Sequence, residues 1–95
     1  MNIDTIRQKY RTQILAIAEK YGAENVRVFG SIARGNETED SDLDLLVHLR
    51  PETSLMDVAG MWGEMSDLLG RKVDIVSEAT IPSYANHIFA EAKPL

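Results

Sequence analysis

The sequence has no cysteine among its 95 residues. This excludes disulfide bridges and thiol catalysis, and it agrees with a cytoplasmic location. No apolar run is long enough to cross a membrane, and the first residues lack the basic and then apolar pattern of a secretory signal. We therefore expect a cytoplasmic protein that does not associate with membranes.

Basic residues are also scarce, with 10 Lys and Arg against 15 Asp and Glu, and the net charge is −5. Affinity for the phosphate backbone of nucleic acids comes mainly from Lys and Arg, so direct nucleic-acid binding is not expected. This charge still permits the binding of a single nucleotide that is carried with a metal ion.

What the chain does contain is the ordinary composition of a globular protein, with 44% hydrophobic and 26% charged residues. Its length suits one domain over residues 1–95, with a small core and little room for a separate substrate-binding domain. A substrate would therefore have to be held by another protein or on an open face of this one.

Apolar residues at helical spacing predict two long helices. The first covers residues 3–21 and ends at Gly22, because glycine suits the left-handed end of a helix. The second begins after Ser54, which can cap it together with Asp57, and ends at Gly70. The apolar stripe of this second helix is predicted to consist of Leu55, Val58, Ala59, Trp62, Met65 and Leu69.

A last helix is predicted to begin at Pro82 and to end at Pro94. Its residues that could dock on the core are Tyr84, Ala85, Ile88, Phe89 and Ala92. Other aromatic and methionine side chains are interpreted as core or packing residues, namely Tyr10, Tyr21, Met56, Met61, Trp62 and Met65. The histidines, His48 and His87, are expected on the surface.

Alternating apolar residues predict strands over residues 25–29, 43–49 and 72–76, with one helical turn over residues 31–34. Together with the helices, this order predicts an α/β (α+β) fold in which a small mixed β-sheet has its helices packed on one face. Along the second strand, one face is apolar and consists of Leu43, Leu45, Val47 and Leu49. The other face is left open by the helices and carries Asp42, Asp44, Leu46 and His48.

Asp42 and Asp44 are the candidate metal ligands. They are two residues apart on a strand, so both side chains leave the same face. Two carboxylates so close repel each other unless a cation lies between them, and aspartate is a poor strand former. Carboxylate oxygens suit Mg²⁺, which also takes phosphate oxygens as ligands. The neighbouring acids Glu37, Glu39 and Asp40 are interpreted as a solvated loop.

Asp74 is a third candidate because it interrupts an otherwise apolar strand on the same open face. Without the acids upstream, a salt bridge with Arg27, Arg71 or Lys72 would be the favoured reason for its presence. Three carboxylates can hold two divalent ions about 4 Å apart, one at the attacking hydroxyl and one at the leaving group. Apolar residues that flank these acids, Phe29, Leu46 and Val76, suggest a surface for a nucleotide base or a partner.

The turn that begins with Gly30 and Ser31 is the candidate phosphate site. Glycine lets the backbone approach a phosphate, and the Ser31 hydroxyl can donate to a phosphate oxygen. Alone, this dipeptide is better explained by an ordinary helix cap. Arg34 is either a phosphate contact or a surface charge, and Arg71 and Lys72 are interpreted as surface residues.

The combination of Gly30-Ser31, ten intervening residues and Asp42-Leu43-Asp44 resembles the signature of the polymerase-β-like nucleotidyltransferase superfamily. The opening Gly-Ser-x-Ala-Arg-Gly and the closing Ser-Asp-x-Asp-Leu resemble its smallest branch, the minimal nucleotidyltransferases. Members of that branch are typically antitoxins encoded beside HEPN-domain ribonuclease toxins. The resemblance covers nearly the whole chain.

The resemblance implies that Gly30 and Ser31 bind the triphosphate of ATP and that Asp42 and Asp44 bind Mg²⁺. Asp74 would complete the metal site and help to deprotonate the acceptor. The implied reaction transfers AMP from ATP to a tyrosine hydroxyl of the partner toxin and so silences it. Two alternatives stay open: an antitoxin that only covers its toxin, and a nucleotidyltransferase for a small molecule or an RNA end.

Overall fold

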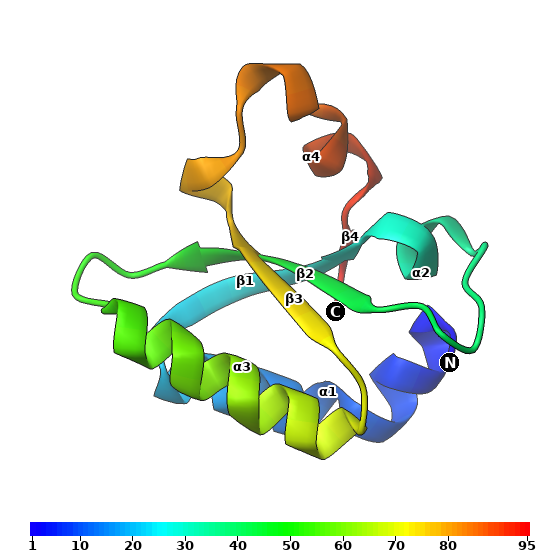
Figure 1. Cartoon of the computed structure of the whole chain (residues 1–95), viewed down its shortest axis with the longest axis horizontal. Helices are drawn as coiled ribbons and strands as arrows, with labels where there is room; N and C mark the ends of the chain where they lie inside the picture. The colour runs from blue at the N-terminus through cyan, green and yellow to red at the C-terminus, as the bar shows by residue number, and fades with distance from the viewer.

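The computed structural model describes residues 1–95 and contains two long helices, two short ones and four strands (Figure 1). The first half of the chain forms α1 (Ile3–Lys20), β1 (Ala23–Phe29), α2 (Gly30–Arg34) and β2 (Leu43–Leu49). The second half forms α3 (Leu55–Leu69), β3 (Val73–Ser77), 3₁₀ turns at Glu78–Thr80 and Ser83–Ala85, α4 (His87–Glu91) and β4 (Lys93–Pro94). None of the helices combines the length and the apolar character that a membrane span requires.

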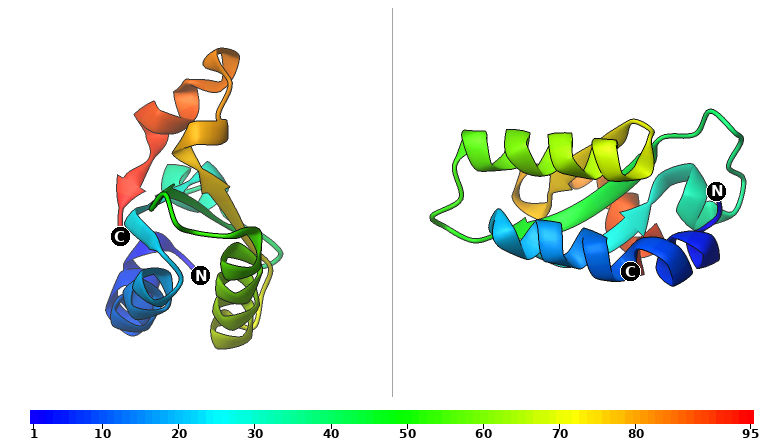
Figure 2. Two further views of the ribbon diagram at one scale, coloured as in Figure 1. Left: turned by 90° about the vertical axis from the view of Figure 1, so that its left-hand side faces the viewer. Right: turned by 90° about the horizontal axis from the view of Figure 1, so that it is seen from below.

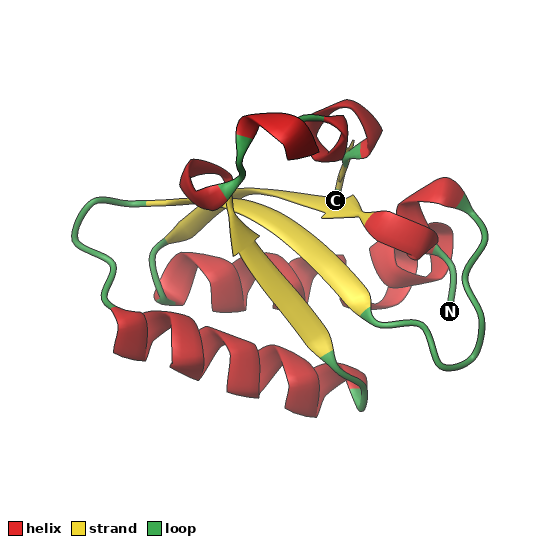
Figure 3. Ribbon diagram, turned by 45° about the horizontal axis from the view of Figure 1, so that its top comes forward, coloured by secondary structure: helices red, strands yellow, loops and turns green.

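The four strands form one mixed sheet in the order β3-β2-β1-β4 (Figure 3). β1 pairs antiparallel with both β2 and β4, whereas β2 and β3 run parallel. Parallel strands need a crossover connection, and α3 supplies it. The predicted small mixed sheet with an α+β arrangement is therefore confirmed.

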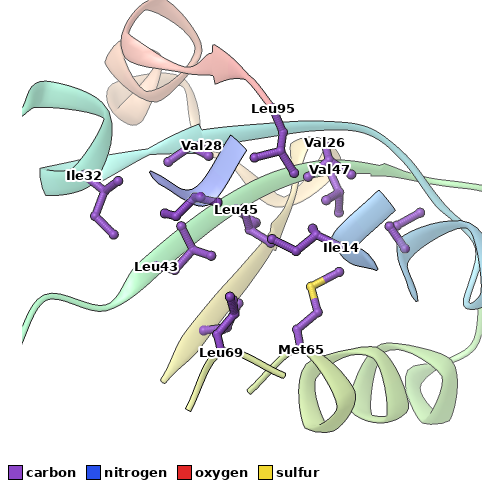
Figure 4. Close-up of a cluster of buried hydrophobic side chains, with 14 of the residues drawn as sticks. Ile14, Val26, Val28, Ile32, Leu43, Leu45, Val47, Met65, Leu69 and Leu95 are labelled. Carbon is purple, nitrogen blue, oxygen red and sulfur yellow. The ribbon is translucent and has the colours of Figure 1, made fainter. Parts of the chain in front are cut away.

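The hydrophobic core lies between the sheet and the two long helices. α1 and α3 lie side by side on one face of the sheet (Figure 2). Alternate residues of β2, Leu43, Leu45 and Val47, are fully buried and meet Ile14 of α1 and Met65 of α3 (Figure 4). Burying each such side chain contributes about 1.5–3 kcal/mol. The predicted apolar face of this strand is confirmed, and its other face is directed away from both helices.

Local sequence signals set most of the element ends. The side chain of Asn2 accepts a hydrogen bond from the Thr5 amide at the start of α1. Ser54 and Asp57 form a reciprocal capping box at the start of α3, and Gly70 ends this helix in the left-handed conformation. The predicted bounds of the two long helices and of the three longer strands agree with the structure to within two residues.

The predicted apolar stripe of α3 is right at Met65 and Leu69 but wrong at Leu55 and Trp62. Met61, Met65 and Leu69 are the buried residues, whereas Leu55 and Met56 are both 84% exposed and Trp62 is 45% exposed. The cause is the contact with α1: a Cβ on Gly60 would lie 2.7 Å from the Tyr21 ring. This close approach turns Met61 toward the core and Trp62 away from it.

The prediction of one last helix is also wrong. The segment forms two 3₁₀ turns, a helix of only five residues and the two-residue strand β4. It lies on the side of the sheet opposite α1 and α3 (Figure 2). Tyr84 is 88% exposed rather than docked. Arg7 donates to the Pro94 carbonyl and Arg11 to the Leu95 carbonyl, so long-range contacts hold the end of the segment extended.

Candidate active site

The candidate site is centred on Asp44 and Asp74, which are register partners on the parallel strands β2 and β3. The pKa of Asp44 is raised from its usual value of 3.8 to about 6, chiefly by partial burial and in addition by the nearby carboxylates of Asp74 and Asp42. Acids with a pKa raised in this way concentrate at functional sites. Asp42, Asp44 and Asp74 are therefore close enough for the charges of the other two to act on Asp44, while their role as metal ligands stays a prediction.

Lys72 lies beside the same carboxylates. Its Nζ is 3.7 Å from Asp42 Oδ2 and 3.8 Å from Asp74 Oδ1. Of the ion pairs suggested for Asp74, the one with Lys72 is present. The other two cations are engaged elsewhere: Arg71 donates to the Ser41 carbonyl, and Arg27 pairs with Glu78. Asp74 therefore has both an adjacent carboxylate and a neighbouring ammonium group.

The donor set fits a divalent cation in its chemistry. Three neighbouring carboxylates supply hard oxygen ligands, and part of the rise in the pKa of Asp44, beyond the larger effect of burial, comes from repulsion that a cation would relieve. As they stand, no three His, Cys, Asp or Glu side chains of the chain surround a common point that could hold a metal ion. The carboxylates of Asp42, Asp44 and Asp74 would have to turn toward one another to do so.

Gly30 lies directly against Asp44. Its φ is +75°, a left-handed conformation, and a Cβ at this position would overlap the Asp44 carboxylate. Only glycine meets both requirements without strain. Ser31 follows at the start of α2 and is partly exposed. The two halves of the sequence motif, separated by ten residues, are therefore in contact.

Glu91 is a residue of this region that the sequence did not reveal. The Gly30 amide donates to Glu91 Oε1 at 3.1 Å, and Arg34 Nη1 donates to both carboxylate oxygens at 3.1–3.2 Å. Burial opposes the charged form of Glu91, but these donors prevail and lower its pKa below the usual value. No sequence pattern links Glu91 to Gly30, because the residues are 61 positions apart.

A cavity of about 440 Å³ opens beside the carboxylates. Asp44 and Asp74 form part of its wall, and the remaining wall is apolar: Phe29, Val58, Trp62, Ile75, Val76 and Ile88. The expectation that Phe29 and Val76 flank the acids is confirmed, and Trp62 is a wall residue rather than a core residue. The same expectation for Leu46 is wrong, because this side chain is completely buried and does not line the cavity.

Residues 11–95 match the model of a family described as the nucleotidyltransferase domain. The chain belongs to this family. This nucleotidyltransferase domain is 36% identical over 93 residues to MJ0435 of Methanocaldococcus jannaschii, assigned as a protein adenylyltransferase, with 97% of this chain and 96% of that protein covered. It is also 36% identical over 67 residues to the protein adenylyltransferase MntA of Thermococcus cleftensis, with 70% and 68% covered.

Solved structures place the nucleotidyltransferase domain in the same fold. A structure assigned as a minimal nucleotidyltransferase matches with a TM-score of 0.86 at 43% identity, covering 100% of this chain and 97% of the other. A toxin–antitoxin complex with AMP-PNP contains a chain that matches with a TM-score of 0.75 at 16% identity, covering 90% and 71%, which is a likeness of fold alone. The resemblance to minimal nucleotidyltransferases is confirmed.

Proposed function

We propose that this chain, acting as a single domain over residues 1–95, is the antitoxin of a toxin–antitoxin pair. It transfers AMP from ATP to a tyrosine hydroxyl of a partner HEPN ribonuclease toxin in the cytoplasm, and this modification neutralises the toxin. The observation that carries the proposal is the position of Asp44, which contacts Gly30 on one side and neighbours Asp74 on the other. Phosphate-binding and carboxylate groups therefore meet at one point.

The nucleotide would lie across this point. The Gly30 amide, the Ser31 hydroxyl and the Arg34 guanidinium are donors for the oxygens of the triphosphate. Asp42, Asp44 and Asp74 are the residues that would hold Mg²⁺. When bound, Mg²⁺ supplies positive charge that neutralises the phosphate oxygens next to the reacting phosphorus. Its charge would also offset the repulsion from Asp74 and Asp42 that, after burial, contributes to the raised pKa of Asp44.

The acceptor would enter from the cavity on the Asp74 side. In-line displacement requires the attacking oxygen to approach opposite the leaving pyrophosphate. Asp44 and Asp74 both form part of the cavity wall, so an acceptor in the cavity lies beside the carboxylates. The apolar wall formed by Trp62, Val76 and their neighbours suits an aromatic ring. The acceptor oxygen bonds to the α-phosphorus, the bond to the bridging oxygen of pyrophosphate breaks, and the hydroxyl proton passes to the Asp74 carboxylate.

The comparisons support the choice of partner. The relatives MJ0435 and MntA are named as protein adenylyltransferases. Two of the solved structures with the same fold are toxin–antitoxin complexes, one with AMP-PNP and one an MntA–HpeT mutant. A tyrosine was replaced by alanine in that mutant. An RNA acceptor is less well supported, because the chain has a net charge of −5.

A second candidate function is an antitoxin that neutralises its toxin only by covering it. The observation that favours it is the exposure of large apolar side chains, since Leu55, Met56 and Tyr84 are each more than four-fifths exposed. Such residues are typical of a surface that a partner protein buries. This candidate needs the same partner but neither ATP nor the carboxylates.

One experiment separates the two functions. The chain is incubated with α-labelled ATP, Mg²⁺ and the HEPN protein encoded beside it, and label on the partner and ribonuclease activity are both measured. We expect Asp44→Asn to abolish labelling and neutralisation. Asp67→Asn, an exposed acid on α3, is the matched control and should retain both. If Asp44→Asn labels the partner as strongly as the parent does, the proposed carboxylate chemistry is wrong. If the parent and both variants neutralise the toxin without labelling it, the antitoxin acts by covering its toxin.

A further inference from the structure

The carboxylate of Glu91 is bound by two of the groups that the proposed function assigns to phosphate. One is the backbone amide of Gly30, at 3.1 Å, and the other is the guanidinium of Arg34, at 3.1–3.2 Å. An amide that points at an anion and an arginine that binds two oxygens are common elements of phosphate sites. The Glu91 side chain is only 20% exposed, so its carboxylate is well enclosed there.

The place that Glu91 occupies is close to the centre of the candidate site. Gly30 contacts the Asp44 carboxylate so closely that no Cβ could be added between them. An anion held by the Gly30 amide is therefore separated only by Gly30 from the Asp44 carboxylate, which is proposed to bind the metal ion. This is the region through which the triphosphate of a bound nucleotide has to run.

The sheet itself delivers Glu91 to this place. β4 pairs antiparallel with β1, with Val28 opposite Lys93 and Arg27 opposite Pro94. Gly30 directly follows β1 as the first residue of α2, and Glu91 is the last residue of α4, two residues before β4, so the same register continued past the strands brings Gly30 opposite Glu91. The Leu95 amide also donates to the Val26 carbonyl at 3.2 Å, which fixes the register from the other end. The contact therefore follows from strand pairing and not from a chance approach of two surface groups.

We propose that Glu91 is an autoinhibitory residue, whose carboxylate occupies the phosphate-binding groups until a nucleotide displaces it. This inference rests on the proposed function of Gly30 and Arg34. Displacement needs only rotation of the Glu91 side chain, because β4 and Leu95 keep the backbone anchored on β1. A triphosphate, with more negative charge than one carboxylate, competes well for the same donors, whereas a nucleoside monophosphate competes poorly.

The test measures the affinity of the intact chain for ATP with Mg²⁺ by calorimetry. We expect Glu91→Ala, which removes the competing carboxylate, to bind ATP about tenfold more tightly than the parent, which corresponds to about 1.4 kcal/mol. Glu91→Gln keeps an acceptor for the Gly30 amide but loses the charge, so its affinity should fall between the two. Glu39→Gln removes the same charge from an exposed loop position and should bind ATP as the parent does.

Equal or weaker binding of ATP by both Glu91 variants would overturn the autoinhibitory role, since weaker binding would make Glu91 a helper of the nucleotide. A second readout does not depend on nucleotide. The amide resonance of Gly30 should shift between the free parent and free Glu91→Ala, and an unchanged resonance would overturn the contact itself. If the parent and all variants bind ATP equally and none transfers AMP, the proposed function and the autoinhibitory role both fail. If they bind ATP equally and the parent transfers AMP normally, only the autoinhibitory role fails.

Discussion

Asp44 and Asp74 are partners in the register of the parallel strands β2 and β3, so two carboxylates project side by side from one face of the sheet. The ladder that aligns them contributes backbone hydrogen bonds, but it also forces like charges together. The folded chain therefore carries an electrostatic cost at the point where the candidate chemistry takes place.

This cost predicts a pH-dependent effect of Asp44→Asn on stability. The folded pKa of Asp44 is about 6 against 3.8, so the folded state binds more protons than the unfolded state between these values, and stability falls as the pH rises through them. We expect the variant to melt at a higher temperature than the parent above about pH 7 and to lose this advantage below about pH 4. Thermal unfolding monitored by circular dichroism measures it. An advantage that is equal at both pH values would contradict the assigned cause.

The contact between Gly30 and Asp44 predicts that Gly30→Ala destabilises the chain. The new Cβ meets the Asp44 carboxylate and is held at a φ of +75°, and such strain costs about 1–3 kcal/mol. Chemical denaturation measures the loss. Gly63→Ala is the matched control: it lies inside α3, where a Cβ meets nothing within 4 Å, and should raise stability by about 0.5–1 kcal/mol. Similar effects of the two substitutions would refute the explanation.

The fluorescence of Trp62 can report directly what binds in the cavity. It is the only tryptophan of the chain, is 45% exposed and lines the cavity beside Asp44 and Asp74. Titration with N-acetyltyrosinamide should shift its fluorescence emission, because an aromatic ring replaces water against the indole. The same titration of Val76→Asp, which adds a charge to the wall, should give no shift. A shift produced by adenosine and not by the phenol would assign the cavity to the nucleotide base.

The ion pair between Arg27 and Glu78 predicts a further stability difference. Arg27 and His48 lower the pKa of Glu78, with the hydrogen bond from Arg27 as the largest cause. A lowered pKa contributes stability that is present at neutral pH and is lost as the pH falls below about 4.5 through the folded pKa. Glu78→Gln should cost about 1 kcal/mol at neutral pH, measured by urea denaturation, and little near pH 3. A loss of the same size at both pH values would exclude the ion pair as its source.

Features that depend on neighbouring residues were predictable from the sequence. The alternation of β2 places Asp44 opposite the buried Leu43 and Leu45, and the capping box of Ser54 needs only four consecutive residues. The phosphate turn and the acid pair belong to one contiguous motif. Strand alternation alone placed Asp42, Asp44 and Asp74 on the open face, whereas the link between these acids and the Gly30-Ser31 turn came from the resemblance to the nucleotidyltransferase signature.

Features that depend on tertiary packing were not predictable. Whether Met61 or Trp62 faces the core is decided by the Tyr21 ring against Gly60, which no periodicity contains. Pro94 reads as the end of a helix but lies in an edge strand, a position that tolerates proline because its missing amide faces outward. The contact of Glu91 with Gly30 depends on that same strand pairing.

The position of β3 at the end of the strand order β3-β2-β1-β4 has a consequence for handling the protein. An unpaired edge invites strands of other molecules, and charged side chains on such an edge discourage this self-association. Lys72 and Asp74 are the charges at this edge. Asp74 therefore protects this edge from self-association and is also part of the candidate active site. The aggregation state of every Asp74 variant has to be measured together with its activity.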